Sequence, residues 1–165
     1  MLYGLTQLNV ELTSRCDKHT LCAFCGHQDP LVHPLLTRGD MSMGLLGRLI
    51  EELAPLGQSL VVQLHRDGDP LALGDSPLRT ILHGLRAHLR SIVTHGEQLG
   101  HKGWALIDQC ESVCVSIFRG DPDRDLQLAS LRSFLDQKGD ALPRVFLKIV
   151  GDMTDDELEP FRGLS

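Results

Sequence analysis

The amino-acid sequence predicts an α/β fold, in which parallel strands alternate with helices around one sheet or barrel. Two observations support this prediction. Short runs of alternating apolar and polar residues, typical of strands, recur along the chain. Each run is followed by a longer segment with apolar residues at helical spacing. Strand–helix units in this rhythm form parallel sheets, because each helix returns the chain to the edge where the next strand starts.

The predicted elements follow one another along the whole chain. Aliphatic and β-branched residues favour strands over residues 7–13, 59–65, 90–94, 111–118 and 144–150. Helical spacing of apolar residues predicts helices over 42–55, 75–89, 97–109, 123–137 and from 154 onwards. Ser42 suits the N-cap of the first helix, whereas Gly100 and Gly103 interrupt the third. Leu89 and Trp104 are expected in the core.

The side chains of the fourth predicted strand divide into two stripes. Val113, Val115 and Ile117 form an apolar stripe, and the alternate residues form the other. If helices cover the outside of a barrel, four polar side chains along the strands face its interior: Glu11, Gln63, Ser116 and Lys148. A packed structural core rarely contains such residues, whereas a ligand cavity does. The strand pattern therefore favours a barrel with a polar site inside it.

Length and composition set limits on the class of protein. The chain has 165 residues, of which 42% are hydrophobic and 23% charged, so we expect a single domain over 1–165 with its own core. The net charge of −6 argues against a nucleic-acid-binding surface. No apolar run approaches membrane-spanning length, and the N-terminus lacks the features of a signal peptide. These features predict a cytoplasmic protein without membrane partners.

Three thiols, Cys16, Cys22 and Cys25, lie within ten residues of one another. In a cytoplasmic protein, clustered cysteines bind metal or act in catalysis more often than they form disulfides. Zinc and iron–sulfur clusters are the two usual occupants of such a loop. Zinc would need a fourth ligand, and three nearby histidines are available for it: His19, His27 and His33. From the loop alone, both occupants stay open.

Four segments follow the order of the motifs of one enzyme family. The cysteine loop has an aromatic residue, Phe24, before its last thiol. The second predicted strand ends in Asp-Gly-Asp-Pro (67–70), which is similar to Gly-Gly-Glu-Pro. The third ends in Thr-His-Gly (94–96), which is similar to Thr-Asn-Gly. The fourth contains Val-Ser-Ile (115–117), which is similar to Val-Ser-(Ile/Leu)-Asp. In these motifs the chain resembles the radical S-adenosylmethionine (radical SAM) enzymes.

The resemblance implies a partial (β/α) barrel of about five to six units with parallel strands. It also implies a [4Fe–4S] cluster held by Cys16, Cys22 and Cys25, with S-adenosylmethionine bound to the remaining iron. One electron from the cluster would cleave S-adenosylmethionine to methionine and a 5′-deoxyadenosyl radical, which abstracts hydrogen from a substrate. The sequence does not identify that substrate, which would be a small molecule or a peptide. A flavodoxin or ferredoxin is implied as the electron donor.

The resemblance places seven residues at the cofactor: Phe24, Gly68, Asp69, Pro70, Thr94, Ser116 and Lys148. Gly68 would let the backbone approach the methionine amino group, because glycine has no side chain. Phe24 would shield the cluster or pack on the adenine. Ser116 and Lys148 would bind the ribose or the carboxylate of the cofactor.

The chain departs from the family pattern in two ways. The common spacing is Cys-x3-Cys-x2-Cys, whereas this chain has Cys-x5-Cys-x2-Cys, so residues 17–21 are expected to bulge without moving the outer thiols. The chain also ends as a fifth or sixth unit begins, so we expect a C-terminal truncation or a barrel open at one side. Two alternatives stay open. One is a zinc-stabilised binding module without catalysis, and the other is a cluster-binding member that no longer turns over.

Overall fold

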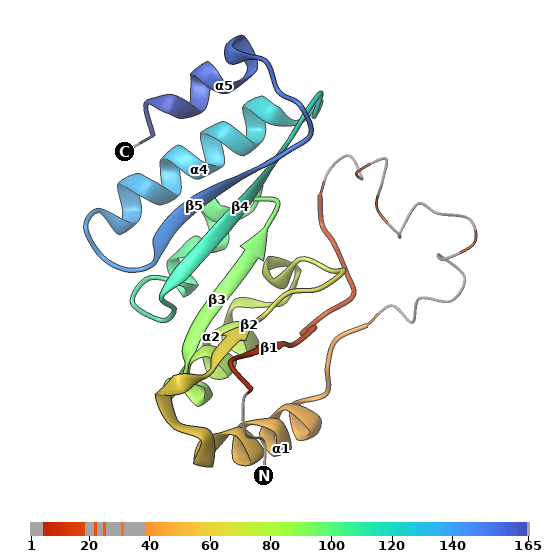
Figure 1. The fold of residues 1–165 in the computed structure, drawn as a ribbon, viewed down its shortest axis with the longest axis vertical. Coiled ribbons are helices and arrows are strands. Elements are labelled where there is room, and N and C mark those ends of the chain that lie inside the picture. Colours follow the sequence, from red (N-terminus) through yellow and green to blue (C-terminus); the bar gives the residue numbers. More distant parts are fainter. Residues whose placement is uncertain (1–4, 19–21, 23–24, 26–30, 32–38, 165) are drawn as a thin grey trace.

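The computed structural model of the protein describes residues 5–18, 22, 25, 31 and 39–164, except the side chains of 57–59. Within these residues, a five-stranded parallel sheet forms the centre, and its strands are adjacent in chain order (Figure 1). The strands are β1 (Gln7–Asn9), β2 (Val61–Gln63), β3 (Leu89–Thr94), β4 (Ser112–Phe118) and β5 (Arg144–Val150). Because the strands are adjacent in chain order, every connection crosses to the next strand in the same direction and with the same hand. The helices in these connections therefore lie on one face of the sheet, as in a barrel. The predicted α/β class with parallel strands is confirmed.

The helices begin close to the predicted positions. They are α1 (Met43–Leu53), α2 (Asp75–Gly84), α3 (Leu99–Lys102), α4 (Arg124–Lys138) and α5 (Asp155–Arg162), with 3-10 turns η2 (Ala54–Ser59), η3 (Pro70–Ala72) and η4 (Gly103–Ala105). The Ser42 hydroxyl accepts a hydrogen bond from the N–H of Leu45 at 3.2 Å and so caps α1, as predicted. Thr154 and Glu157 form a capping box at the start of α5.

The two faces of the sheet differ in polarity. Val113, Val115 and Ile117 are fully buried, which confirms the apolar stripe predicted for β4. On the alternate positions of β2, β3 and β4, three polar residues lie side by side in register: Gln63, Ser91 and Ser112. One face therefore packs in the core. The other face, called the polar face below, carries this row of polar side chains together with apolar ones such as Val93, Cys114 and Phe146.

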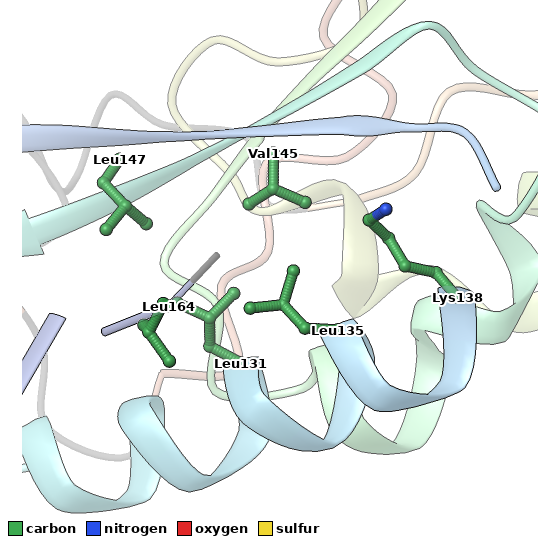
Figure 2. A pocket seen from close by; sticks show the side chains of 6 residues that line it. All are labelled: Leu131, Leu135, Lys138, Val145, Leu147 and Leu164. Atoms are coloured by element: carbon green, nitrogen blue, oxygen red, sulfur yellow. The ribbon is translucent and has the colours of Figure 1, made fainter. Parts of the chain in front are cut away.

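Helix α4 packs on the apolar face of β5. Figure 2 shows Leu131 and Leu135 of α4 directed toward Val145 and Leu147 of β5. Between them is a small pocket of about 200 Å³, and its lining is completed by Lys138 and Leu164. Because this apolar pocket lies between the sheet and a helix, it is separate from the polar face.

The first two strands are shorter than predicted. β1 ends at Asn9 instead of residue 13, and β2 covers only the middle of the predicted 59–65. After β1 the chain leaves the sheet, and Thr13 forms an isolated antiparallel bridge with Asp40. The Thr13 hydroxyl also donates a hydrogen bond to the Asp40 carboxylate at 2.7 Å. This departure brings the segment before the cysteine loop against the turn that follows β2, where Asp69 N–H donates to the carbonyl of Arg15.

The prediction of a long helix over 97–109 is wrong. The structure has only the four residues of α3, followed by η4. Gly100 and Gly103 allow this segment to lie very close to α4, because a Cβ on Gly103 would stand 2.4 Å from the Phe134 ring. A Cβ on Gly100 would stand 3.3 Å from the Cα of Ser130. The length of the helix in this segment is therefore determined by close packing against α4 and not by helix propensity.

Two residues expected in the core are exposed. Leu89 begins β3 instead of ending a helix, and it is 46% exposed. Trp104 is 43% exposed, and the guanidinium of Arg79 lies 5.2 Å from the centre of its ring. This cation–π contact gives the tryptophan a partner at the surface instead of in the interior.

Among the described residues, no helix combines the length and apolar character needed to cross a membrane.

Candidate functional site

Two predicted cofactor residues, Asp69 and Thr94, are in direct contact at the carboxyl ends of β2 and β3. The Asp69 Oδ2 atom accepts hydrogen bonds from the Thr94 hydroxyl and from the N–H of His95, both at 2.8 Å. Its Oδ1 atom accepts another from the N–H of Leu71 at 2.9 Å. Asp69 and Thr94 are buried, as is the adjacent Pro70, which begins η3. The Asp69 carboxylate therefore ties the end of β2 to the end of β3.

Gly68 lies where the turn after β2 packs against the chain that leads to the cysteine loop. A Cβ on Gly68 would stand 2.0 Å from the carbonyl oxygen of Thr13 and 2.7 Å from that of Arg15. The N–H of Gly68 donates to the Glu11 carboxylate at 3.2 Å. Only glycine fits this position, because the neighbouring atoms belong to the backbone and cannot turn away. The close approach that glycine permits is made here to the protein's own chain.

Asp17, next to the first thiol, is held by two cationic side chains. Its Oδ1 atom lies 3.2 Å from Nε2 of His95, and its Oδ2 atom accepts from Nζ of Lys102 at 3.1 Å. Burial by itself raises the pKa of Asp17, but the hydrogen bonds from His95 and Lys102 outweigh it and lower the pKa. Burial by itself lowers the pKa of His95, but its hydrogen bonds to Asp17 and Cys16 raise that pKa to about 10. The first thiol therefore has a histidine and an ionised carboxylate beside it.

Lys18 is buried at the centre of a second charged group. Its ammonium donates to Glu97 at 2.8 Å, to Asp121 at 2.9 Å and to Asp123 at 3.2 Å. The exposed fraction of the Lys18 side chain is only 2%. Burial by itself lowers the pKa of Lys18, but the hydrogen bonds to Glu97 and Asp121 raise it above its ordinary value, so the ammonium stays charged.

The three thiols of the cysteine loop, Cys16, Cys22 and Cys25, are each half-buried. The N–H of Cys25 donates to the carbonyl of Cys22 at 2.9 Å, which makes a tight turn between the last two. Burial raises the pKa of Cys22 to about 11, and the negative charges of Cys25, Asp121 and Cys16 add to this, while Lys18 opposes it. The sulfur atoms of Cys16 and Cys25 thus lie near enough to Cys22 to affect its pKa.

Thiol ligands suit both an iron–sulfur cluster and a single zinc ion. Among the described residues, no three side chains of histidine, cysteine, aspartate or glutamate converge on one ion position. Sulfur ligands of one zinc ion must all lie about 2.3 Å from it, whereas the thiolates of an iron–sulfur cluster bind separate irons and stand further apart. Three half-buried thiols in one loop supply the ligands of a cluster with one iron open, and together with a histidine they would supply those of a zinc ion. The histidines of the zinc alternative, His19, His27 and His33, lie outside the described residues, as does Phe24.

The remaining predicted positions lie on the polar face of the sheet. Ser116 of β4 and Lys148 of β5 are directly paired in register. Ser116 is buried, whereas Lys148 is exposed. The Ser116 carbonyl accepts a hydrogen bond from the amide of Gln127, which also donates to the carbonyl of His95. This buried amide from α4 holds the ends of β3 and β4 together.

A comparison with solved structures identifies a match to this arrangement of strands and helices. The fold resembles that of BtrN. The crystal structure of BtrN in complex with AdoMet and 2-DOIA superposes with a TM-score of 0.64 at 19% sequence identity. The match covers 91% of this chain and 58% of the BtrN chain, so this chain spans little more than half the length of BtrN. The fold is accordingly an α/β partial barrel, as predicted. No protein-family model matches the sequence, and no curated protein matches it significantly.

Sequence reasoning missed most of the charged residues around the cysteine loop. Asp17 and Lys18 were visible only as part of an unusually long gap between two thiols. Glu97 and Lys102 fell inside a segment predicted as an ordinary helix. Gln127 gave no signal at all, because a glutamine inside an amphipathic helix is expected on its exposed face. Two clues were available: the adjacent opposite charges of Asp17 and Lys18, and the acidic run over 121–125, which could bind a cation but is typical of a helix-capping loop.

Proposed function

We propose that this chain is a radical SAM enzyme that binds a [4Fe–4S] cluster through Cys16, Cys22 and Cys25. One observation carries the proposal: three half-buried thiols lie in one loop, and Asp17 and Lys18 of that loop contact the segment just after β3 in a parallel partial barrel. Ligand sites of such folds lie at the carboxyl ends of the strands. The similarity of the fold to BtrN, whose crystal structure holds AdoMet, supports the same proposal.

The chain's own residues would hold and orient the reactants. Cys16, Cys22 and Cys25 would supply three thiolates, which leaves one iron open for another ligand. When bound, the cluster would supply the electron that cleaves S-adenosylmethionine to methionine and a 5′-deoxyadenosyl radical. The protein supplies position and exclusion of water, and the polar face that carries Ser116 and Lys148 would hold the cofactor's ribose or carboxylate.

In this proposal the turn after β2 meets the cofactor through its backbone and not through the Asp69 side chain. The Asp69 carboxylate is engaged by Thr94, His95 and Leu71, so it would act by fixing the turn and not by binding the cofactor directly. Gly68 and Pro70 would then offer backbone groups to the methionine end of S-adenosylmethionine. Phe24 would lie over the cluster or the adenine.

The proposal also covers the domain, the compartment, the substrate class and the electron donor. Residues 1–165 would form one domain that acts in the cytoplasm on a small molecule or a peptide. A flavodoxin or a ferredoxin would supply the electron. BtrN was crystallised with 2-DOIA, but nothing in this chain's described residues selects that compound as its substrate.

Anaerobic reconstitution with iron and sulfide tests the proposal. The protein should become brown and hold about four irons per chain, and reduction with S-adenosylmethionine present should yield 5′-deoxyadenosine. Cys22→Ala should lose the cluster, whereas Cys114→Ala, which changes a half-buried thiol on β4, should keep it.

Three other outcomes would contradict the proposal in different ways. A colourless protein with one zinc per chain would favour the zinc-stabilised binding module. A full cluster without 5′-deoxyadenosine would favour a member that no longer turns over. Full iron content in Cys22→Ala would mean that the ligands are assigned wrongly.

A further inference from the structure

The long gap between Cys16 and Cys22 contains a buried cation with three partners. The Lys18 ammonium has three N–H groups, and each donates to a different carboxylate at 2.8 to 3.2 Å. All of its hydrogen-bonding capacity is therefore used within the protein. A surface lysine gains little from such pairing, but this one is withdrawn from water together with its partners.

The three carboxylates come from two different loops at the carboxyl end of the sheet. Glu97 follows β3 and lies 79 residues after Lys18 in the sequence. Asp121 and Asp123 follow β4 and lie just before α4, at separations of 103 and 105 residues. Lys18 thus fastens the cysteine loop across two neighbouring strand ends at once.

The three acidic partners meet at this one ammonium. Oδ1 of Asp121 contacts Lys18, whereas its Oδ2 atom is buried and has no hydrogen-bond partner among the described residues. Three carboxylates surround the Lys18 ammonium, and Oε1 of Glu97 also lies 3.8 Å from Nδ1 of His95. Removal of the ammonium would leave like charges close together out of water. The loop therefore cannot move away from this position without a large electrostatic cost.

The preceding residue makes a separate attachment. Asp17 contacts His95 and Lys102, and Lys102 also donates to the carbonyl of Leu71 at 2.7 Å. Asp17 is thus fixed to the loop after β3 and to α3, and Lys18 to the loops after β3 and β4.

We propose that Lys18 is the positioning residue of the cysteine loop, which holds Cys16 and Cys22 over the carboxyl ends of β3 and β4 where the cluster would bind. The role in cluster binding rests on the proposed function. The attachment of the loop is a property of the chain itself, so it can be tested without any metal.

Thiol labelling of the metal-free protein provides the test. Lys18→Met removes the ammonium but keeps the length of the side chain, and a maleimide reagent followed by mass spectrometry gives the labelling rate of each cysteine. Cys16 and Cys22 should react about fivefold to tenfold faster than in the unaltered protein, because the loop opens more often. Cys114 on β4 should be unchanged. Loss of the Lys18 charge by itself disfavours the Cys22 thiolate and would slow its labelling. A faster rate at Cys22 therefore reports opening of the loop.

Lys138→Met is the matched control, because Lys138 lies at the end of α4 and donates only to the carbonyls of Gly139 and Ala141 among the described residues. Its labelling rates should equal those of the unaltered protein. If Lys18→Met does not fold, Glu97→Ala takes its place, and the same two thiols should react at least about twofold faster. Unchanged rates at Cys16 and Cys22 in the folded variant would overturn the proposal.

A second measurement separates this inference from the proposed function. After anaerobic reconstitution, Lys18→Met should hold less than about half the iron of the unaltered protein, while Lys138→Met should hold the full amount. If the unaltered protein binds no iron but the labelling rates change as expected, the proposed function fails and the attachment by Lys18 stands. Full iron content in Lys18→Met, with unchanged labelling, would show that Lys18 does not position the loop.

Discussion

The hydroxyl of Thr94 donates a hydrogen bond to the carboxylate of Asp69, with 2.8 Å between Oγ1 and Oδ2. The same hydroxyl oxygen accepts from the N–H of Gly96 at 3.0 Å. Both side chains are buried, so neither can exchange its partner for water. One threonine therefore joins the turn after β2 to the loop after β3, which also contains Glu97, a partner of Lys18.

Replacement of Thr94 by valine should destabilise the protein. The substitution keeps the shape but leaves the Asp69 carboxylate short of one donor and the N–H of Gly96 without an acceptor, at a cost of about 2 kcal/mol. Urea unfolding of the metal-free protein, followed by circular dichroism, measures this change. Thr80→Val on the exposed side of α2 is the control and should stay within about 0.5 kcal/mol. Equal stability of the two variants would contradict the structural role of the bond.

Replacement of Gly68 by alanine should disturb the cysteine loop. The new Cβ would overlap the carbonyl oxygens of Thr13 and Arg15, so the turn after β2 must move away from the chain that leads to Cys16. We expect a loss of about 3 kcal/mol in unfolding free energy and a lower iron content after reconstitution. Gly74→Ala is the matched control, because its Cβ would meet only the Pro77 ring at an ordinary 3.5 Å. Iron binding equal to that of the control would contradict this expectation.

The sequence was sufficient for the parts of the fold that local patterns decide. The stripe of Val113, Val115 and Ile117 was predictable, because β4 is a central strand whose alternate side chains enter the core. The cap at Ser42 was predictable for the same reason, since a cap depends on only a few neighbouring residues. The end of the helix at Lys102 was not predictable from the sequence, because it depends on how close Gly103 lies to α4.

The candidate site was predictable only where its residues stand in short motifs. Asp69 and Thr94 lie in segments that resemble family motifs, and the structure brings them into contact. The pairing of Lys18 with Glu97 and Asp121 spans 79 and 103 residues. No local pattern indicates that charges so far apart in the sequence will be buried together, so the attachment of the cysteine loop was found only in three dimensions.

Two glycines should respond to alanine in opposite directions. A Cβ on Gly103 would stand 2.4 Å from Cδ2 of Phe134, whose ring is fully buried and cannot move aside, so Gly103→Ala should cost about 1 to 3 kcal/mol. Gly47 lies inside α1, and a Cβ added there would meet nothing within 4 Å, so Gly47→Ala should stabilise by about 0.5 to 1 kcal/mol. Thermal unfolding of both variants measures the difference. A stabilised Gly103→Ala would mean that η4 and α4 do not pack this closely.

Glu111 should make stability depend on pH. Its carboxylate lies 2.7 Å from the guanidinium of Arg90, which is buried and also donates to the carbonyl of Leu82. Burial by itself raises the pKa of Glu111, but the hydrogen bonds from Arg90 lower it below the ordinary value of 4.5. The unfolded chain therefore takes up the proton first as pH falls. The stabilisation is complete above pH 4.5 and is lost as pH falls through the lower folded-state pKa.

Glu111→Gln should accordingly be less stable than the unaltered protein by roughly 1 kcal/mol at neutral pH, a figure reduced because the carboxylate is partly exposed. The difference should shrink toward zero as the pH falls below the folded-state pKa of Glu111, because both proteins then carry a neutral side chain at this position. Urea unfolding at a series of pH values measures it. Glu159→Gln, which alters an exposed pair with Arg162, should show no such dependence. A difference that stays constant down to low pH would mean that the ion pair with Arg90 is not its source.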